Sequence, residues 1–215
     1  IIQSSYALDD EAKRVHASSW LVNSQYVSSS GLLKESSNST LKRIWVVTDN
    51  VLASLALKYR YSYFAGQLDA RLRSEYGQYL YKQNRIEAIV YGKVLSFPFK
   101  DVEKVKVKSV GGYDVYTEVI KETVLPDWEE YADLLGYASA SYLNAGNVSM
   151  AKHYYTKFAS MWNGTGFIDK AFLAQNNTFQ VFKCAFFVYL TNRLNATATF
   201  IGDVKTRIWN AYDLS

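Results

Sequence analysis

Hydrophobic residues in the first third of the chain recur at helical spacing. Between residues 8 and 28, Val15, Val22 and Tyr26 follow a period near 3.6 residues, as expected for a helix with one buried face. The same spacing predicts two further helices, over residues 49–60 and 67–83. The N-terminal part is therefore expected to be helical.

The pattern changes to alternation between residues 86 and 124. Segments 87–95, 102–110 and 113–119 alternate apolar and polar residues and are rich in Val and Tyr, which is typical of strands. Gly111-Gly112 between the last two segments is a two-residue turn of the kind that hairpins prefer. We expect a small antiparallel β insert over 86–124.

Helical spacing then returns and continues to the end of the chain. Asp127 after Pro126, followed by Glu130, predicts a capped helix start, and further helices are expected over 149–162, 176–193 and 198–212. The predicted fold class is mainly α: one domain of stacked helical hairpins over residues 1–215, with the β insert inside it.

A loop sequence repeats within the chain. Ser30-Gly31-Leu32-Leu33-Lys34-Glu35 recurs as Thr165-Gly166-Phe167-Ile168-Asp169-Lys170, and an apolar helix is predicted about 18 residues after each glycine. Each unit therefore consists of a helix, a glycine-containing elbow and a second helix. Such units bury their apolar faces by stacking on one another.

The first unit resembles the repeat of α/α-toroid proteins, the six-hairpin glycosidase-like group, and archaeal surface proteins of unknown role that are similar to them. The residues that carry this resemblance are Trp20-Leu21-Val22, Gly31-Leu32-Leu33-Lys34-Glu35, Trp45, and Thr48-Asp49-Asn50. The resemblance implies a partial α/α toroid. It also implies a sugar-binding cleft, in which Glu35, Trp45, Asp49 and Asn50 would be the candidate ligand-binding residues.

Each candidate also has a simpler structural interpretation. Asp49 is a plausible N-cap, Glu35 a loop charge, and Trp45 a core anchor. Asp133 belongs to an acidic group in the first turns of a predicted helix, where negative charge complements the helix dipole, and its alternative role is to face a cleft. The second repeat has Lys183-Cys184 near the place of Asp49-Asn50, so the polar pair is not repeated. We therefore lean towards a protein without catalytic activity.

Composition and charge exclude several classes of protein. Apolar residues make up 49% and charged residues 20%, which is typical of a globular chain, and the net charge of +4 lacks the clustered basic face of a nucleic-acid-binding protein. The longest apolar run, 184–190, is far shorter than the roughly 20 residues of a transmembrane helix. His16 and His153 lack metal-ligand spacing, and no phosphate-binding glycine loop is present, so neither a metal nor a cofactor is expected.

Five acceptor triplets of the form Asn-x-Ser/Thr predict N-glycosylation, and they begin at Asn38, Asn147, Asn163, Asn176 and Asn195. Each falls at a predicted loop or helix end, where a glycan would be accessible. The alternative is that these asparagines only cap helices. Together with the mature-looking start at Ile1, the triplets favour an extracellular or cell-surface protein.

Three functions remain open on the sequence. The leading expectation is an exported, glycosylated surface protein that binds a glycan or another surface protein without catalysis, because the chain holds 18 Tyr and 5 Trp for stacking contacts. The first alternative is a carbohydrate-active hydrolase or lyase with Asp49 and Glu35 as its acidic pair. The second alternative is self-assembly into an extracellular filament or coat through exposed strand edges.

Overall fold

The computed structural model describes residues 10–36, 40–80 and 85–213. Contacts between residues divide the chain into two compact units, which are described separately. Unit 1 comprises the described residues of 1–84 together with 102–120, and unit 2 comprises 85–101 and the described residues from 121 onward. Both units are mainly helical, as predicted. The expectation of a single domain over 1–215 stays a prediction.

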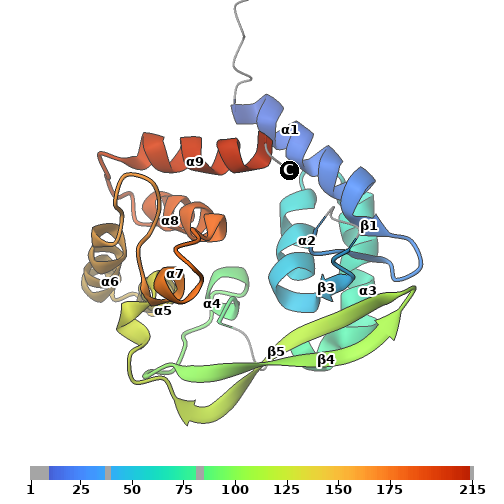
Figure 1. Ribbon diagram of the computed structural model, residues 1–215, viewed down its shortest axis with the longest axis horizontal. Helices are drawn as coiled ribbons and strands as arrows, with labels where there is room; N and C mark the ends of the chain where they lie inside the picture. The colour runs from blue at the N-terminus through green and yellow to red at the C-terminus, as the bar shows by residue number, and fades with distance from the viewer. Residues whose placement is uncertain (1–9, 37–39, 81–84, 214–215) are drawn as a thin grey trace, which may run out of the picture. The chain divides into compact units, whose positions relative to one another are not determined.

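Unit 1 consists of short helical segments, three very short strands and the greater part of a long β hairpin. Its elements are α1 (Asp10–Trp20), the π-helical segment η1 (Leu21–Gln25), β1 (Tyr26–Val27), β2 (Leu32–Leu33), β3 (Arg43–Trp45), the π-helical segment η2 (Val46–Val51), α2 (Leu52–Leu57), α3 (Ser62–Leu80), and most of β4 (Lys100–Val110) and β5 (Tyr113–Val124) (Figure 1).

The β insert is confirmed for its last two strands. Strands β4 and β5 form a hairpin across Gly111 and Gly112, whose positive φ angles of 57° and 79° suit the predicted two-residue turn. The observed sheet has the order β3-β5-β4, and β3 pairs parallel to β5 with Ile44 opposite Val115. Because Ile44 and Val115 are fully buried, this register directs one face of the sheet into the core of unit 1.

The predicted first strand, over 87–95, is wrong. Residues Glu87–Val90 form the short helix α4, in which Glu87 and Ala88 are buried, and Ile86 before it is buried as well. The Asn144 side chain donates to the carbonyls of Ala88 and Lys93 and so ties the segment to a helix of unit 2. A short apolar run has too few residues to distinguish a strand from a helix by periodicity.

Unit 2 is built on helices that pack pairwise. Besides α4, its elements are the 3-10 turn η3 (Trp128–Glu130), α5 (Ala132–Asn144), α6 (Val148–Ser160), α7 (Lys170–Ala174), α8 (Val181–Arg193) and α9 (Ile201–Asp213). Helix α5 packs closely on α6, and α8 packs on α9. At Gly136 of α5, an added Cβ would lie 2.6 Å from the Phe186 ring, so the close packing of unit 2 depends on this small residue.

The capping box predicted at Asp127 is wrong. Asp127 makes no capping hydrogen bond and its carboxylate pairs with Lys170, while α5 begins only at Ala132. The Asp169 carboxylate accepts from Ala132 N at 2.9 Å and also from Phe172 N at 2.9 Å in α7. One buried carboxylate thus caps two helices, an arrangement that local sequence rules do not detect.

The boundaries of two predicted helices also differ. The helix expected over 8–28 ends at Gln25, because its last turn is π-helical and the chain then enters β1. The helix expected over 176–193 begins at Val181, because Asn176 and Asn177 have positive φ angles of 51° and 58°, which interrupt a right-handed helix.

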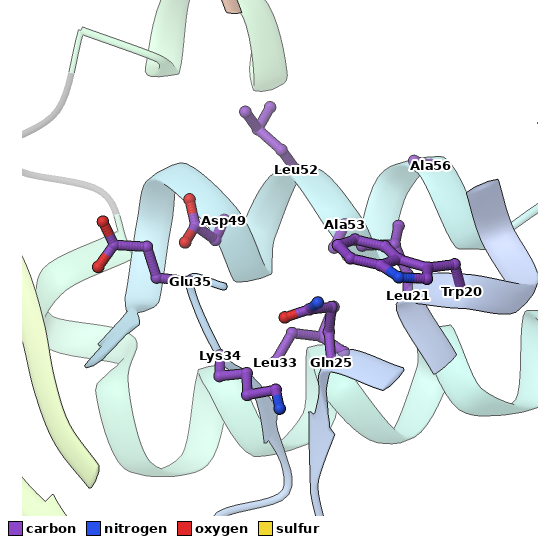
Figure 2. A pocket seen from close by; sticks show the side chains of 10 residues that line it. All are labelled: Trp20, Leu21, Gln25, Leu33, Lys34, Glu35, Asp49, Leu52, Ala53 and Ala56. Carbon is purple, nitrogen blue, oxygen red and sulfur yellow. The ribbon is translucent and has the colours of Figure 1, made fainter. Parts of the chain in front are cut away.

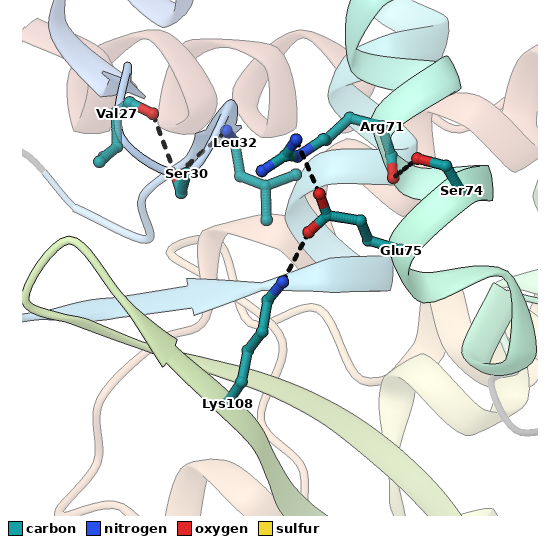
Figure 3. A network of polar contacts seen from close by, with 7 residues as sticks. All are labelled: Val27, Ser30, Leu32, Arg71, Ser74, Glu75 and Lys108. Atoms are coloured by element: carbon teal, nitrogen blue, oxygen red, sulfur yellow. Dashed lines mark hydrogen bonds and ion pairs between the residues drawn. The ribbon is translucent and has the colours of Figure 1, made fainter.

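Ion pairs join α3 to β4 close to the elbow of unit 1, and Ser30 makes separate hydrogen bonds within the elbow (Figure 3). Glu75 pairs with Arg71 at 2.7 Å and with Lys108 at 2.5 Å, and the hydrogen bond from Lys108 lowers the pKa of Glu75 below its ordinary value. Gly31 lies over the Arg71 side chain, which an added Cβ would meet at 3.6 Å. The ion pairs therefore join α3 to β4, and the Arg71 side chain lies within contact distance of the elbow at Gly31.

Candidate functional site

A pocket of about 310 Å³ opens in unit 1 between η1, the elbow and the start of α2 (Figure 2). Its walls are formed by Trp20, Leu21, Gln25, Leu33, Lys34, Glu35, Asp49, Leu52, Ala53 and Ala56. Figure 2 shows the carboxylates of Glu35 and Asp49 towards one end and the Trp20 indole towards the other. The pocket therefore has an acidic end and an apolar, aromatic end.

The elbow that supplies one wall is a tight reversal between β1 and β2. Tyr26 pairs with Leu33 and Val27 with Leu32 in antiparallel register. The reversal is closed by Gly31, whose φ of 67° favours glycine and whose N–H donates to Val27 O at 2.8 Å. Lys34 and Glu35 emerge directly after β2 and so reach the mouth of the pocket.

Asn50 holds the elbow against the helix that follows it. The side chain is fully buried, and its Oδ1 accepts from Leu33 N at 2.7 Å. Its Nδ2 donates to Leu33 O at 2.9 Å and to Trp45 O at 2.7 Å. Because all these partners are backbone groups, the structure gives Asn50 a positioning role, and it does not line the pocket.

Asp49 lies beside Asn50 but faces the pocket. Burial raises its pKa from an ordinary value of 3.8 to about 7, with a further contribution from the negative charge of Glu35, and a hydrogen bond from Thr48 acts in the opposite direction. Asp49 can therefore hold or release a proton close to neutral pH. Its predicted role as an N-cap is wrong, because the helical segment already begins at Val46, with Trp45 as its preceding residue.

Glu35 is the second carboxylate of the pocket and is anchored to β3. Its N–H donates to Arg43 O at 2.9 Å, and its Oε2 lies 3.8 Å from Arg43 Nε. This backbone bond fixes where the side chain starts, and the ion pair offsets part of its charge. Two of the residues predicted from the toroid resemblance, Glu35 and Asp49, are thus brought to one pocket.

Trp45 is not among the residues that line this pocket. It lies on β3 in partial burial, with its ring 5.6 Å from that of Tyr116. Lys104 Nζ lies 5.0 Å from the Trp45 ring and 4.1 Å from the Tyr116 ring. Trp45 therefore makes cross-strand contacts on the sheet.

Asp133 belongs to unit 2 and takes part in a buried charge cluster there. Its Oδ1 lies 4.0 Å from Lys183 Nζ, which also donates to Asp169 Oδ2 at 2.5 Å. Burial raises the pKa of Asp133, while the charge of Lys183 opposes this shift. In the internal repeat, Lys183-Cys184 stands near the place of Asp49-Asn50. Lys183 forms an internal ion pair with Asp169, whereas Asp49 faces a pocket.

Cys184 is buried as well, and burial raises the pKa of its thiol to about 11.

Four of the five predicted glycosylation asparagines lie on the surface: Asn147, Asn163, Asn176 and Asn195 are exposed. Asn147 caps α6 by accepting from Met150 N, and Asn163 accepts from the N–H groups of Thr165 and Gly166. These capping contacts use the side-chain oxygen. Asn38 lies outside the described residues.

Sequence reasoning missed most of the pocket wall. Trp20 belongs to the residues that carry the toroid resemblance, but it was not a candidate ligand-binding residue, and neither were Gln25, Leu52, Ala53 and Ala56. The 3.6-residue spacing of Leu52, Ala53 and Ala56 places them on one helix face, but that spacing predicts burial in a core and not a pocket wall. The Asp169–Lys183 pair was missed because its partners are 14 positions apart, which is too far for any local sequence pattern to relate them.

Across the described parts of the chain, no group of three or more His, Cys, Asp or Glu side chains is arranged to hold a metal ion. In the same residues, no helix has the length and apolar character needed to cross a membrane. Comparisons of the chain with protein-family models, with curated proteins and with solved structures found no match.

Proposed function

We propose that the pocket of unit 1 binds a glycan. The observation that carries this proposal is the meeting of two carboxylates and a tryptophan in one cavity of about 310 Å³. Carboxylates accept hydrogen bonds from sugar hydroxyls, and an indole offers a flat apolar face to the C–H side of a sugar ring. The volume lies at the lower end of the range for small-molecule sites, which suits one or two sugar units.

The proposed fold family supports the same conclusion. We infer that the helical hairpins belong to a partial α/α toroid, in which acidic and aromatic residues at elbow-to-helix junctions form the sugar site. In support, both repeated elbows contain a short antiparallel bridge after a helix: Tyr26 with Leu33 in unit 1, and Trp162 with Phe167 in unit 2. A polar side chain of a later helical segment binds each elbow: Asn50 of η2 in one, and Lys183 of α8, which comes after α7, in the other.

The proposed setting is the cell surface or the extracellular space. The support is the five Asn-x-Ser/Thr triplets of the sequence and the exposure of Asn147, Asn163, Asn176 and Asn195. A glycan-binding protein in that setting would meet the sugars of its own or a neighbouring cell surface.

A glycan array followed by titration calorimetry tests the binding proposal. We expect a saturable glycan ligand whose affinity falls about tenfold or more in Trp20→Ala, because the stacking face is lost. Tyr63→Ala is the matched control, since Tyr63 is an aromatic residue of unit 1 that is 79% exposed and does not line the pocket. If no glycan binds, or if both variants lose affinity equally, the pocket is not the site.

A second candidate function is a glycoside hydrolase or polysaccharide lyase. The observation that favours it is the pKa of Asp49, which burial and Glu35 raise to about 7, because an acid that is protonated near neutral pH can donate to a leaving group. Glu35 would then be the second carboxylate of the pair. Turnover of a polysaccharide panel that disappears in both Asp49→Asn and Glu35→Gln would establish catalysis, and absent turnover would leave binding alone.

A further inference from the structure

The acidic end of the pocket has an incomplete charge balance. Glu35 has Arg43 as its ion-pair partner at 3.8 Å. Among the residues that the structure describes, no lysine or arginine forms an ion pair with Asp49, and the groups that influence it are Glu35 and Thr48. Lys34 also lines the pocket, but Figure 2 shows its side chain directed away from both carboxylates. A positively charged group would therefore be accommodated between Asp49 and Glu35.

Unit 2 provides an example of an ammonium group bound between carboxylates within this chain, although its carboxylates do not occupy the positions of Glu35 and Asp49 in the repeat. In unit 2, Lys183 of α8 inserts its ammonium group between two carboxylates, 2.5 Å from Asp169 Oδ2 and 4.0 Å from Asp133 Oδ1. The Lys183 side chain is 2% exposed and that of Asp169 is 0% exposed, whereas that of Asp133 is 22% exposed, so the Lys183–Asp169 pair is closed to solvent. Unit 2 thus supplies its own ammonium, whereas the elbow of unit 1 borders an open cavity.

We propose that the pocket of unit 1 recognises a primary amine on its glycan ligand, that is, an amino sugar without an N-acetyl group. The ammonium would occupy the acidic end, between Asp49 and Glu35, and the sugar ring would lie against Trp20 at the other end. This inference rests on the proposed glycan binding and specifies the class of sugar.

Charge and hydrogen bonding together favour an amine over a hydroxyl at this position. An ammonium group donates up to three hydrogen bonds and pairs with both carboxylates, and such charge-assisted bonds are roughly twice as strong as neutral ones. It would also relieve the repulsion between Glu35 and Asp49. A uronic acid would add a third negative charge at the same end and would be rejected.

Titration calorimetry with glucosamine, N-acetylglucosamine and glucose at about pH 7 tests the inference. We expect glucosamine to bind the protein about tenfold or more tightly than either neutral sugar. In Asp49→Asn and in Glu35→Gln, that preference should fall to about threefold or less, since one carboxylate is lost in each. Asp69→Asn is the control, because Asp69 pairs with Arg73 on the outer surface of α3 and does not line the pocket.

The outcomes separate this inference from the proposal on which it rests. Equal affinity for all three sugars, lost in Trp20→Ala, would overturn the amine preference and leave glycan binding in place. Failure of all three sugars and of the wider glycan array would overturn both. Circular dichroism and thermal unfolding establish that each variant is folded. If one carboxylate variant unfolds, the other still decides the question, because both side chains are required for the preference.

Discussion

Asp49 owes its unusual chemistry to its place in the fold and not to its neighbours in the chain. Its carboxyl group lies in the wall of the pocket, so its charged form loses much of its hydration, and the charge of Glu35 disfavours it further. The adjacent residue, Asn50, is fully buried and binds only backbone groups of the elbow. Two consecutive polar residues thus have separate roles, one in the pocket and one in the scaffold.

The raised pKa of Asp49 predicts a stability change with pH. The folded state binds this proton more tightly than the unfolded state does, so the group destabilises the fold progressively as pH rises from about 4 to about 7. Between pH 5 and pH 8, we expect the free energy of unfolding of Asp49→Asn to rise relative to wild type by about 2 to 3 kcal/mol. Urea unfolding at several pH values measures this difference.

Asp69→Asn controls for the loss of one carboxylate from unit 1, because Asp69 lies at the surface of α3, paired with Arg73. Carboxylates with lowered pKa values, such as Glu75 and Asp127, contribute the opposite trend to the total stability. The comparison is therefore between the variant and wild type at each pH. A difference that stays constant between pH 5 and pH 8 would contradict the burial of Asp49.

At the scale of elements, the packing of α5 depends on residues without side-chain bulk. A Cβ at Gly136 would lie 2.6 Å from Phe186 Cε1 and 3.1 Å from Phe158 Cε1. Both rings are held by further aromatic contacts, including that of Tyr137 with Phe186, so they have little freedom to move aside. Small residues predominate among the buried positions of α5, and at Gly136 the close approach of the two rings leaves no room for a side chain.

Gly136→Ala is therefore expected to destabilise the protein by about 1 to 3 kcal/mol through overpacking. Gly202→Ala in α9 is the matched control, because nothing lies within 4 Å of its added Cβ and alanine favours a helix by up to about 1 kcal/mol. Thermal and denaturant unfolding of the two variants measure the contrast. If Gly136→Ala stabilises the protein as Gly202→Ala does, the described contact between α5 and Phe186 is wrong.

At the scale of the whole molecule, exposed asparagines predict that the protein is N-glycosylated. Asn147, Asn163, Asn176 and Asn195 are exposed at loops and helix ends, where a glycan can be added without disturbing either core. Mass spectrometry of the protein from its native source should show added mass on peptides that contain these asparagines. The same protein expressed in a host without N-glycosylation is the control, and unmodified native peptides would remove the main support for export.

The sequence by itself determined the mainly helical class, the β4–β5 hairpin with its Gly111-Gly112 turn, and the approximate positions of the longer helices. These features follow from the hydrophobic periodicity within each segment and from the backbone freedom of glycine. Both depend only on residues that are close together in the sequence. The resemblance to α/α-toroid proteins also singled out Glu35 and Asp49, which do share a pocket.

Only the tertiary structure decided what depends on residues far apart in the chain. Residues 87–90 form a helix, and the N-terminus of α5 is capped by Asp169 in place of Asp127. Lys183 forms a charge cluster with Asp169 and Asp133. The tertiary structure also placed Trp20 and Asp49 at opposite ends of one pocket and directed the Asn50 side chain to the backbone of the elbow. Burial, ion pairing and cavity shape arise from packing between distant segments, so the hydrophobic pattern of a single segment does not contain them.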